Sequence, residues 1–138
     1  MAFQKGNAVE VVSKEDGLAG SYYKAKVIKK LANKKYIVQY FNLVEEEDSK
    51  VPLREVVEEE ELRPVPPKVP VTGGFSSGEI VDAFDNDGWW VGVVSHAKCP
   101  DIYEVRFESY KKAKFATSEL RVHQDWVNSK YWLTSEYN

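Results

Sequence analysis

The chain contains few of the residues that build catalytic and metal sites. Its 138 residues include one cysteine and two histidines, so neither an internal disulfide nor a cysteine-based zinc site can form. It shows no Ser/His/Asp order, no glycine-rich phosphate loop and no cluster of metal ligands. Cys99 and His96 share a short loop, but nothing marks a third catalytic partner, so we interpret Cys99 as a surface thiol. The sequence therefore predicts no enzyme activity, no metal and no cofactor.

Long apolar runs are also absent. No stretch approaches the ~18 apolar residues of a membrane-spanning helix, and no signal-peptide pattern opens the chain. Alanine and leucine runs at helical spacing are missing as well. These absences predict a chain that does not enter a membrane and is not mainly helical. The single cysteine fits a reducing, intracellular compartment.

What the chain does contain is an internal repeat built around aromatic residues, which make up 13% of the sequence. Four markers occur twice in the same order. They are Phe3-x-x-Gly6-x-x-Val9-Glu10-Val11 and Phe75-x-x-Gly78-x-x-Val81-Asp82-Ala83, Tyr22-Tyr23 and Trp89-Trp90, Tyr36-x-Val38-x-Tyr40 and Tyr103-x-Val105-x-Phe107, and Glu61-Leu62-Arg63 and Glu119-Leu120-Arg121. The copies differ in their connections, which tolerate insertion better than paired strands do. Such a repeat predicts a small binding domain used in tandem.

The repeat divides the chain into two units of similar size. We expect repeat 1 at residues 1–65, a linker rich in proline and glycine at 66–74, and repeat 2 at 75–138. Units this small bury only about 60% of their unfolded surface. We therefore expect the two repeats to pack on each other as one rigid body.

Short β-branched and aromatic segments between turn signals predict an all-β barrel or sandwich. The expected strands are residues 9–12, 22–30, 36–41 and 51–57 in repeat 1 and residues 79–84, 89–95, 102–107 and 114–117 in repeat 2. Asn33-Lys34 and residues 85–88 are expected to be turns. One short C-terminal helix is expected at residues 123–132. Its expected anchors are Trp126 and either Tyr131 or Trp132.

The net charge of −3 conceals an acidic segment. From Glu45 to Glu61, nine acids stand against Lys50 and Arg54. Such a block attracts cationic ligands and repels phosphate. We interpret its later acids as contacts for a basic peptide, with a plain solvated loop as the alternative. These acids are Glu55, Glu58, Glu59, Glu60 and Glu61.

Three aromatic residues of repeat 2 stand at predicted strand ends, namely Phe84, Trp90 and Phe107. If they meet at one rim of a curled sheet, they form a cage for a methylated ammonium group, with roughly 0.5–2 kcal/mol of cation–π attraction per ring. A nearby carboxylate, from Asp85, Asp87 or Glu108, would favour a mono- or dimethylated lysine, because these forms still carry an N–H.

Repeat 1 predicts a poorer cage. Val12 replaces the first ring, which leaves Tyr23 and Tyr40 as a second pocket. The alternative for all of these rings is core or cross-strand packing. Phe3 and Phe75 are predicted to fill the core instead of a site.

The order of these motifs resembles the plant Agenet domain, a Tudor-like module of the Royal superfamily. The resemblance rests on residues 75–84, on Asp87-Gly88-Trp89-Trp90-Val91-Gly92, on Tyr103-x-Val105-x-Phe107 and on Leu120-Arg121-x-His123-x-Asp125-Trp126. Copy one matches through Gly6-x-x-Val9-Glu10-Val11, Gly20-Ser21-Tyr22-Tyr23-x-Ala25 and Leu62-Arg63-Pro64. The likeness covers nearly the whole chain and is strongest to plant heterochromatin readers that carry several such cassettes.

This resemblance implies two five-stranded Tudor-like (SH3-like) barrels packed side by side. It implies a monomeric cassette of a longer nuclear protein that takes part in heterochromatin and gene silencing. The implied partner is the histone H3 tail, dimethylated on its ninth lysine and unmodified on its fourth. A Tudor-type cage would fall on Phe84, Trp90 and Phe107. In the family, an acidic residue that completes the cage usually follows the third strand. Here Ser109 stands close to that place, and Glu108 is next to it.

Other functions remain open at this point. A lysine strip in repeat 1 and a shorter one in repeat 2 favour nucleic-acid binding as a secondary activity. The strips are Lys24, Lys26, Lys29, Lys30, Lys34 and Lys35, and Lys111, Lys112 and Lys114. A scaffold without a working cage, or a reader of methylarginine or proline-rich ligands, belongs to the same barrel class.

Overall fold

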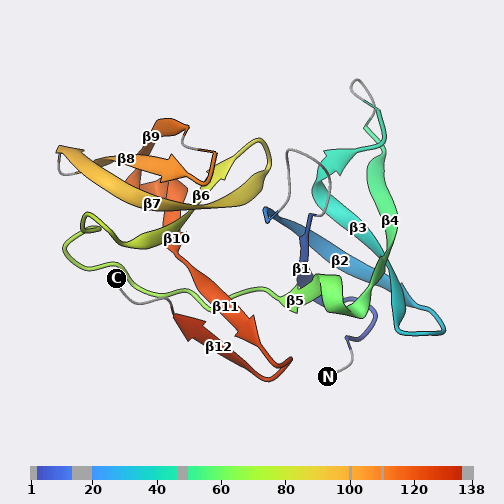
Figure 1. Cartoon of the computed structure of the whole chain (residues 1–138). Coiled ribbons are helices and arrows are strands. Elements are labelled where there is room, and N and C mark those ends of the chain that lie inside the picture. The colour runs from blue at the N-terminus through green and yellow to red at the C-terminus, as the bar shows by residue number, and fades with distance from the viewer. Residues whose placement is uncertain (1–2, 14–19, 47–49, 100, 110, 135–138) are drawn as a thin grey trace. The chain divides into compact units, whose positions relative to one another are not determined.

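The computed structural model describes residues 3–13, 20–46, 50–99, 101–109 and 111–134 (Figure 1). The side chain of Cys99, interpreted from the sequence as a surface thiol, lies outside the described part. The chain divides into two compact units, Met1–Val65 and Pro66–Asn138. Each unit is described separately.

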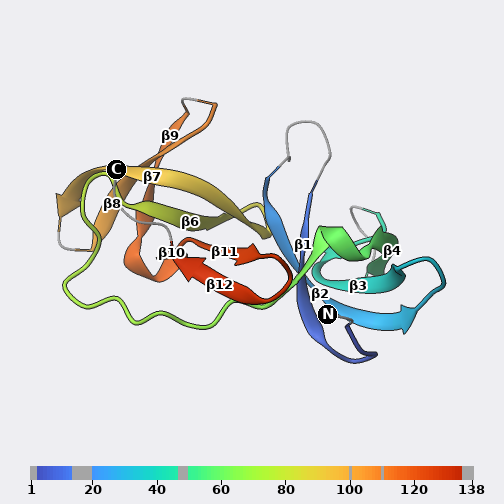
Figure 2. The same ribbon diagram turned by 60° about the horizontal axis from the view of Figure 1, so that its bottom comes forward.

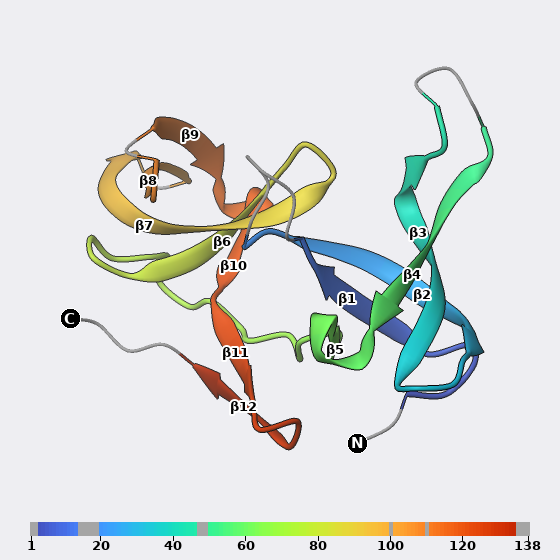
Figure 3. The same ribbon diagram turned by 45° about the vertical axis from the view of Figure 1, so that its right-hand side comes forward.

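Unit 1 is a strongly curved antiparallel sheet in the order β5-β1-β2-β3-β4 (Figure 1). Its strands are β1 (Ala8–Val12), β2 (Tyr22–Lys30), β3 (Lys35–Val44), β4 (Pro52–Glu58) and β5 (Leu62–Pro64), with a single 3₁₀ turn, Glu59–Glu61, before β5. The β2–β3 hairpin turns through Asn33 and Lys34, both at positive φ, as a two-residue hairpin turn requires. β3 pairs with β2 only as far as Tyr40. Past that residue, β3 and β4 continue together as a two-stranded ribbon (Figure 3).

Unit 2 repeats this topology in the order β10-β6-β7-β8-β9. Its strands are β6 (Ile80–Asp85), β7 (Gly88–Cys99), β8 (Ile102–Phe107), β9 (Lys112–Ala116) and β10 (Leu120–Val122), with a 3₁₀ turn, Thr117–Glu119, before β10. A separate hairpin follows, formed by β11 (Gln124–Val127) and β12 (Tyr131–Thr134) and visible as its own ribbon in Figure 2.

The predicted all-β, tandem Tudor-like fold is confirmed, and each of the eight predicted strands is present within a few residues of its expected bounds. The sequence did not locate the fifth strand of each unit. These strands, β5 and β10, are three residues long and contain the Leu-Arg of the last repeat marker. They were missed because three residues are too few to show alternation.

The predicted C-terminal helix is wrong. Residues 124–134 form the β11–β12 hairpin, in which Trp126 pairs with Trp132 across the strands at a ring distance of 5.1 Å. Asn128 and Ser129 at the tip have φ values of 52° and 55°, which suit a tight hairpin turn. Two tryptophans six residues apart lie about 120° apart around a helix and do not share one of its faces. Across a hairpin they form a direct pair, and aromatic residues favour strands.

The same aromatic contact closes the core of each unit. Phe3 packs edge-on against Tyr36 at 5.9 Å, and Phe75 packs edge-on against Tyr103 at 5.5 Å. Each tyrosine hydroxyl also accepts the backbone N–H of its phenylalanine, at 3.2 and 3.1 Å. The prediction that Phe3 and Phe75 fill the core is therefore confirmed, since both are buried.

The arginine of each Glu-Leu-Arg marker joins three strands of its unit. In unit 1, Arg63 of β5 donates to Glu10 of β1 at 2.7 Å, and its guanidinium lies 3.5 Å from the centroid of the Tyr22 ring in β2. Glu10 and Arg63 are both buried. Breaking a buried pair is costly because it leaves an uncompensated charge in a region of low dielectric.

Unit 2 repeats this arrangement and adds a histidine. Arg121 of β10 donates to Asp82 of β6 at 2.8 Å and lies 4.1 Å from the centroid of the Trp89 ring. The ring of the buried His123 contacts Asp82 through Nδ1 at 2.7 Å and Asp125 through Nε2 at 2.9 Å. Burial lowers the pKa of His123. The hydrogen bonds and charges of Asp82 and Asp125 outweigh burial, so the pKa is raised above its usual 6.5. His123 thus ties β6 to the β11–β12 hairpin.

Replacing Glu10 by alanine should lower the free energy of unfolding of unit 1 by about 3–5 kcal/mol, because Arg63 loses its buried partner. Urea denaturation followed by circular dichroism measures the change. The exposed Glu60→Ala is the control and should shift stability by less than about 0.5 kcal/mol. Equal stability of the two variants would contradict the assigned role of Glu10.

His123 should make the stability of unit 2 depend on pH. Because its folded pKa is raised, its contribution is fully present below about pH 6.5 and is lost as the pH rises through the folded pKa. Urea denaturation at about pH 6 and about pH 9 should therefore show a decrease that is smaller in His123→Asn. If both proteins lose the same stability, His123 is not the responsible group.

Candidate functional site

Trp90 and Phe107 lie on the same face of the unit 2 sheet. In the register, Trp90 is opposite the core residue Ala83, and Phe107 is opposite Gly92, two residues further along β7. Residues two apart in a strand share a face, so both rings are on the face that continues into the core. They are diagonal neighbours across β7 and β8, a spacing that aromatic side chains can bridge.

Both rings are held by specific contacts. The indole N–H of Trp90 donates to the backbone carbonyl of Asp85 at 2.8 Å. Phe107 packs edge-on against Phe115 at 5.9 Å. Gly92 makes room for Phe107, because a Cβ at this position would lie 3.1 Å from that ring and 2.5 Å from Val105. Trp90 and Phe107 are each half-buried, so part of each ring remains available to a ligand.

Phe84 lies on the opposite face of the sheet from Trp90. It pairs with Trp89 in the register, and the two rings meet edge-on at 5.1 Å. The structure therefore does not bring Phe84, Trp90 and Phe107 together on one face, as the sequence had predicted. The cause is the register. The two-residue turn Asn86-Asp87 pairs Asp85 with Gly88, and this determines which face each residue of β7 takes as far as Val94, where the register becomes irregular.

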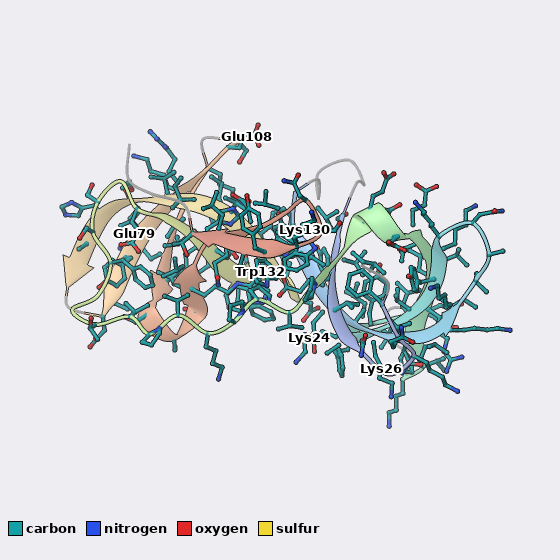
Figure 4. The ribbon with its side chains drawn as sticks, turned by 90° about the horizontal axis from the view of Figure 1, so that it is seen from below. Lys24, Lys26, Glu79, Glu108, Lys130 and Trp132 are labelled. Atoms are coloured by element: carbon teal, nitrogen blue, oxygen red, sulfur yellow. The ribbon has the colours of Figure 1, made fainter. Side chains whose placement is uncertain are left out.

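Two of the predicted acidic residues of unit 2, Asp85 and Glu108, are both exposed. Asp85 is exposed at the end of β6, and its carboxylate accepts the backbone N–H of Asn86 at 3.1 Å. Glu108 is exposed in the connection after β8, as Figure 4 shows. Neither carboxylate makes a described contact with Trp90 or Phe107, and Asp85 contacts Trp90 only through its backbone carbonyl.

Unit 1 places an acid beside its own rings. Tyr23 and Tyr40, the predicted second pocket, face the core on either side of Ala25 and are only 7% and 6% exposed. The Tyr40 hydroxyl donates to the carboxylate of Glu55 at 2.7 Å. Glu55 belongs to β4 and stands opposite Val38, which puts it on the same face as the two tyrosines.

Sequence reasoning missed this grouping because it treated Glu55 only as part of the acidic segment. Counting pairs from the predicted β3–β4 register would have placed it on the core-facing side. The equivalent position in unit 2, counted from the Glu-Leu-Arg markers, is Ala113, which lies opposite Val105. The two rings of unit 1 thus have a carboxylate that those of unit 2 lack at this position.

The remaining acids of unit 1 divide into two groups. Glu58 and Glu60 are exposed, whereas Glu59 and Glu61 are half-buried. Glu59 accepts the Tyr36 hydroxyl at 2.9 Å. Burial and the Glu59 carboxylate both raise the pKa of Tyr36, although the hydrogen bond from Phe3 lowers it. Glu59 therefore has a structural partner, and Glu58 and Glu60 are the more available acids.

Other kinds of site were also sought in the part of the chain that the structure describes. Within that part, no group of three or more His, Cys, Asp or Glu side chains is arranged to hold a metal ion. Among the same residues, no helix has the length and apolar character to cross a membrane.

Comparisons with known proteins agree with this architecture. The Agenet domain family matches residues 6–67. The chain is 39% identical over 135 residues to Protein AGENET DOMAIN (AGD)-CONTAINING P1 of Arabidopsis thaliana, covering 97% of this chain and 26% of that protein. It is 34% identical over 135 residues to DUF724 domain-containing protein 6 of the same plant, covering 94% of this chain and 19% of that protein. The chain thus spans about a quarter or less of these relatives.

Two solved structures are similar over nearly the whole chain. The AGD34 segment of Arabidopsis thaliana AGDP1 matches with a TM-score of 0.87 at 37% identity, covering 95% of this chain and 88% of that one. The tandem Agenet domain 3-4 of ADCP1 matches with a TM-score of 0.85 at 34% identity, covering 97% of this chain and 89% of that one.

Proposed function

This chain belongs to the Agenet domain family, and we propose that it is a non-catalytic chromatin reader of the methylated histone H3 tail. The observation that carries the proposal is the pair Trp90 and Phe107, two half-buried rings on one face of unit 2. Aromatic faces attract methylated ammonium groups through cation–π interaction and burial of the methyl groups, at about 0.5–2 kcal/mol per ring.

The ring pair acts as a preformed surface. Trp90 is fixed by its N–H bond to the Asp85 carbonyl, and Phe107 is fixed by Phe115 and by the absence of a side chain at Gly92. Rings that are already ordered lose little entropy when a ligand binds. Phe84 does not join them, so its proposed part is limited to supporting Trp89 on the other face.

The acids of unit 1 supply the second part of the proposal. A histone tail is basic, and the exposed Glu58 and Glu60 lie in a segment with a strong negative charge. Such charges raise the rate of encounter with a cationic peptide and pair with its unmodified side chains. The fourth lysine of H3, unmodified, is the proposed partner of these acids.

The proposed mark is dimethylation of the ninth lysine, which the likeness to plant heterochromatin readers supports. A dimethylated ammonium retains one N–H, and a carboxylate next to aromatic rings selects for it. In unit 1, the carboxylate of Glu55 accepts the Tyr40 hydroxyl and so lies next to an aromatic ring. Tyr23, Tyr40 and Glu55 are therefore proposed as a second candidate site. A nuclear location and a role in gene silencing follow from the same proposal.

Trp90→Ala should abolish the dependence of binding on methylation, because it removes one ring of the pair. Calorimetry with H3 peptides carrying an unmodified or a mono-, di- or trimethylated ninth lysine measures this, with an expected loss of about tenfold or more for the dimethylated peptide. Phe84→Ala is the matched control, an aromatic on the opposite face, and should bind nearly as the parent does. A larger loss in Phe84→Ala than in Trp90→Ala would overturn the assignment.

Glu58→Lys with Glu60→Lys should slow association with the H3 peptide while changing dissociation little. Stopped-flow measurements at low and high ionic strength separate the two rates. The difference from the parent protein should shrink as salt rises, since salt screens exposed charges. An association rate that is unchanged at low salt would show that these acids are only a solvated surface.

A further inference from the structure

The outer face of the unit 1 sheet, opposite its core, carries an ordered set of cations. In the register, Lys26 of β2, Gln39 of β3 and Arg54 of β4 form one row across three strands. Lys24 stands two residues before Lys26, so it shares this face, and Figure 4 shows both lysines projecting from β2. Arg54 donates to the side-chain oxygen of Gln39 at 2.9 Å, which fixes its position.

An exposed aromatic ring belongs to the same face. The Lys24 ammonium lies 5.1 Å from the centroid of the Phe41 ring, and Phe41 remains 54% exposed. Lys24, Lys26, Arg54 and Phe41 together are called the outer basic face. Its cations come from two distant segments, because Arg54 lies inside the acidic stretch of the sequence and the fold brings it to the lysines.

Protection of a sheet edge does not explain these lysines. Lysine on an edge strand prevents pairing with other chains, but within unit 1 β2 pairs with β1 on one side and with β3 on the other. The acid opposite Lys24, Glu10, is 2% exposed and is bound to Arg63. The charge of Glu10 is therefore neutralised by Arg63 and is not available to Lys24. The outer basic face presents net positive charge to solvent.

Unit 2 shows that the fold does not require this surface. Counted from Tyr22-Tyr23 and Trp89-Trp90, the positions of Lys24, Lys26 and Phe41 correspond to Val91, Val93 and Glu108. The same strands accept apolar or acidic residues there. In the same row of unit 2, Arg106 and Lys112 stand at the positions of Gln39 and Arg54. The two lysines of β2 and the exposed ring of Phe41 are therefore the features particular to unit 1.

We propose that the outer basic face of unit 1 binds single-stranded nucleic acid. Lys24, Lys26 and Arg54 contact successive phosphates, and Phe41 stacks on a base. Alternate residues of a strand stand about 6.6 Å apart, which suits an extended chain of phosphates. Base stacking on an exposed ring tolerates any sequence, so the recognition is directed to the backbone and to unpaired bases. A phosphorylated peptide would use the cations but not the ring.

Fluorescence anisotropy with a labelled single strand of about 20 nucleotides tests the proposal. Each phosphate contact contributes about −0.7 to the slope of log K against log salt for single strands, so the parent slope should be about −2. Lys24→Val with Lys26→Val, which introduces the residues of unit 2, should weaken binding about tenfold or more at low salt. It should also reduce the slope by about 1.4.

Phe41→Ala separates stacking from charge. It should weaken binding about tenfold at every salt concentration and leave the slope unchanged. A duplex of the same sequence should bind the parent protein more weakly than the single strand, because its bases are already stacked. Equal affinity of Phe41→Ala and the parent for the single strand would overturn the stacking role.

Lys111→Val with Lys114→Val is the matched control, since it removes the same charge from unit 2. It should bind the single strand as the parent does. Binding that falls equally in both double variants, or that does not depend on salt, would overturn the proposal. So would capture of a phosphorylated peptide through the outer basic face with no binding of the oligonucleotide. Binding of the histone peptide by Lys24→Val with Lys26→Val should be unchanged, so this test is independent of the proposed reader function.

Discussion

The structure depends on an ion pair that recurs in the two units. It joins two buried side chains in unit 1, and the buried Asp82 and the partly buried Arg121 in unit 2. The arginine that ends each repeat crosses from the last strand to an acid of the first strand and covers an aromatic ring of the second, as Arg63 does with Glu10 and Tyr22. The pair therefore closes the curled sheet by joining strands that are far apart in sequence. A guanidinium suits this position because it is planar, always charged and able to stack and donate at once.

Register divides each sheet into a face that continues into the core and a face turned outward. In unit 2 the first face carries Trp90 and Phe107, and the second carries Trp89 beneath Arg121. In unit 1 the first face carries Tyr23, Tyr40 and Glu55, and the second carries the outer basic face. The two units share their framework and differ at the working positions. The duplication therefore provides two different surfaces on one topology, and not two copies of one site.

Much of the fold could be predicted from the sequence because strands and tight turns are local. Asn33-Lys34 and Asn86-Asp87 both form the expected hairpin turns at positive φ, and the repeat markers fall on equivalent strands. The C-terminal segment was wrongly interpreted as a helix anchored by Trp126 and Trp132, although residues six apart do not share a helical face. The segment instead forms a hairpin in which the two rings are in contact across the strands. This contact is made between two strands and cannot be seen in the local sequence pattern.

The sequence by itself determined the repeat, four of the five strands of each sheet, and the core positions of Phe3 and Phe75, because alternation and turn chemistry act over a few neighbouring residues. Only the tertiary structure decided which side chains meet. It placed Phe84 and Trp90 on opposite faces of the sheet, and it brought Glu55 within hydrogen-bonding distance of Tyr40. It also placed Arg54, from the acidic stretch, in one row with Lys26. The physical reason is that a side chain's face depends on the register between strands distant in sequence, and a shift of one residue reverses that face.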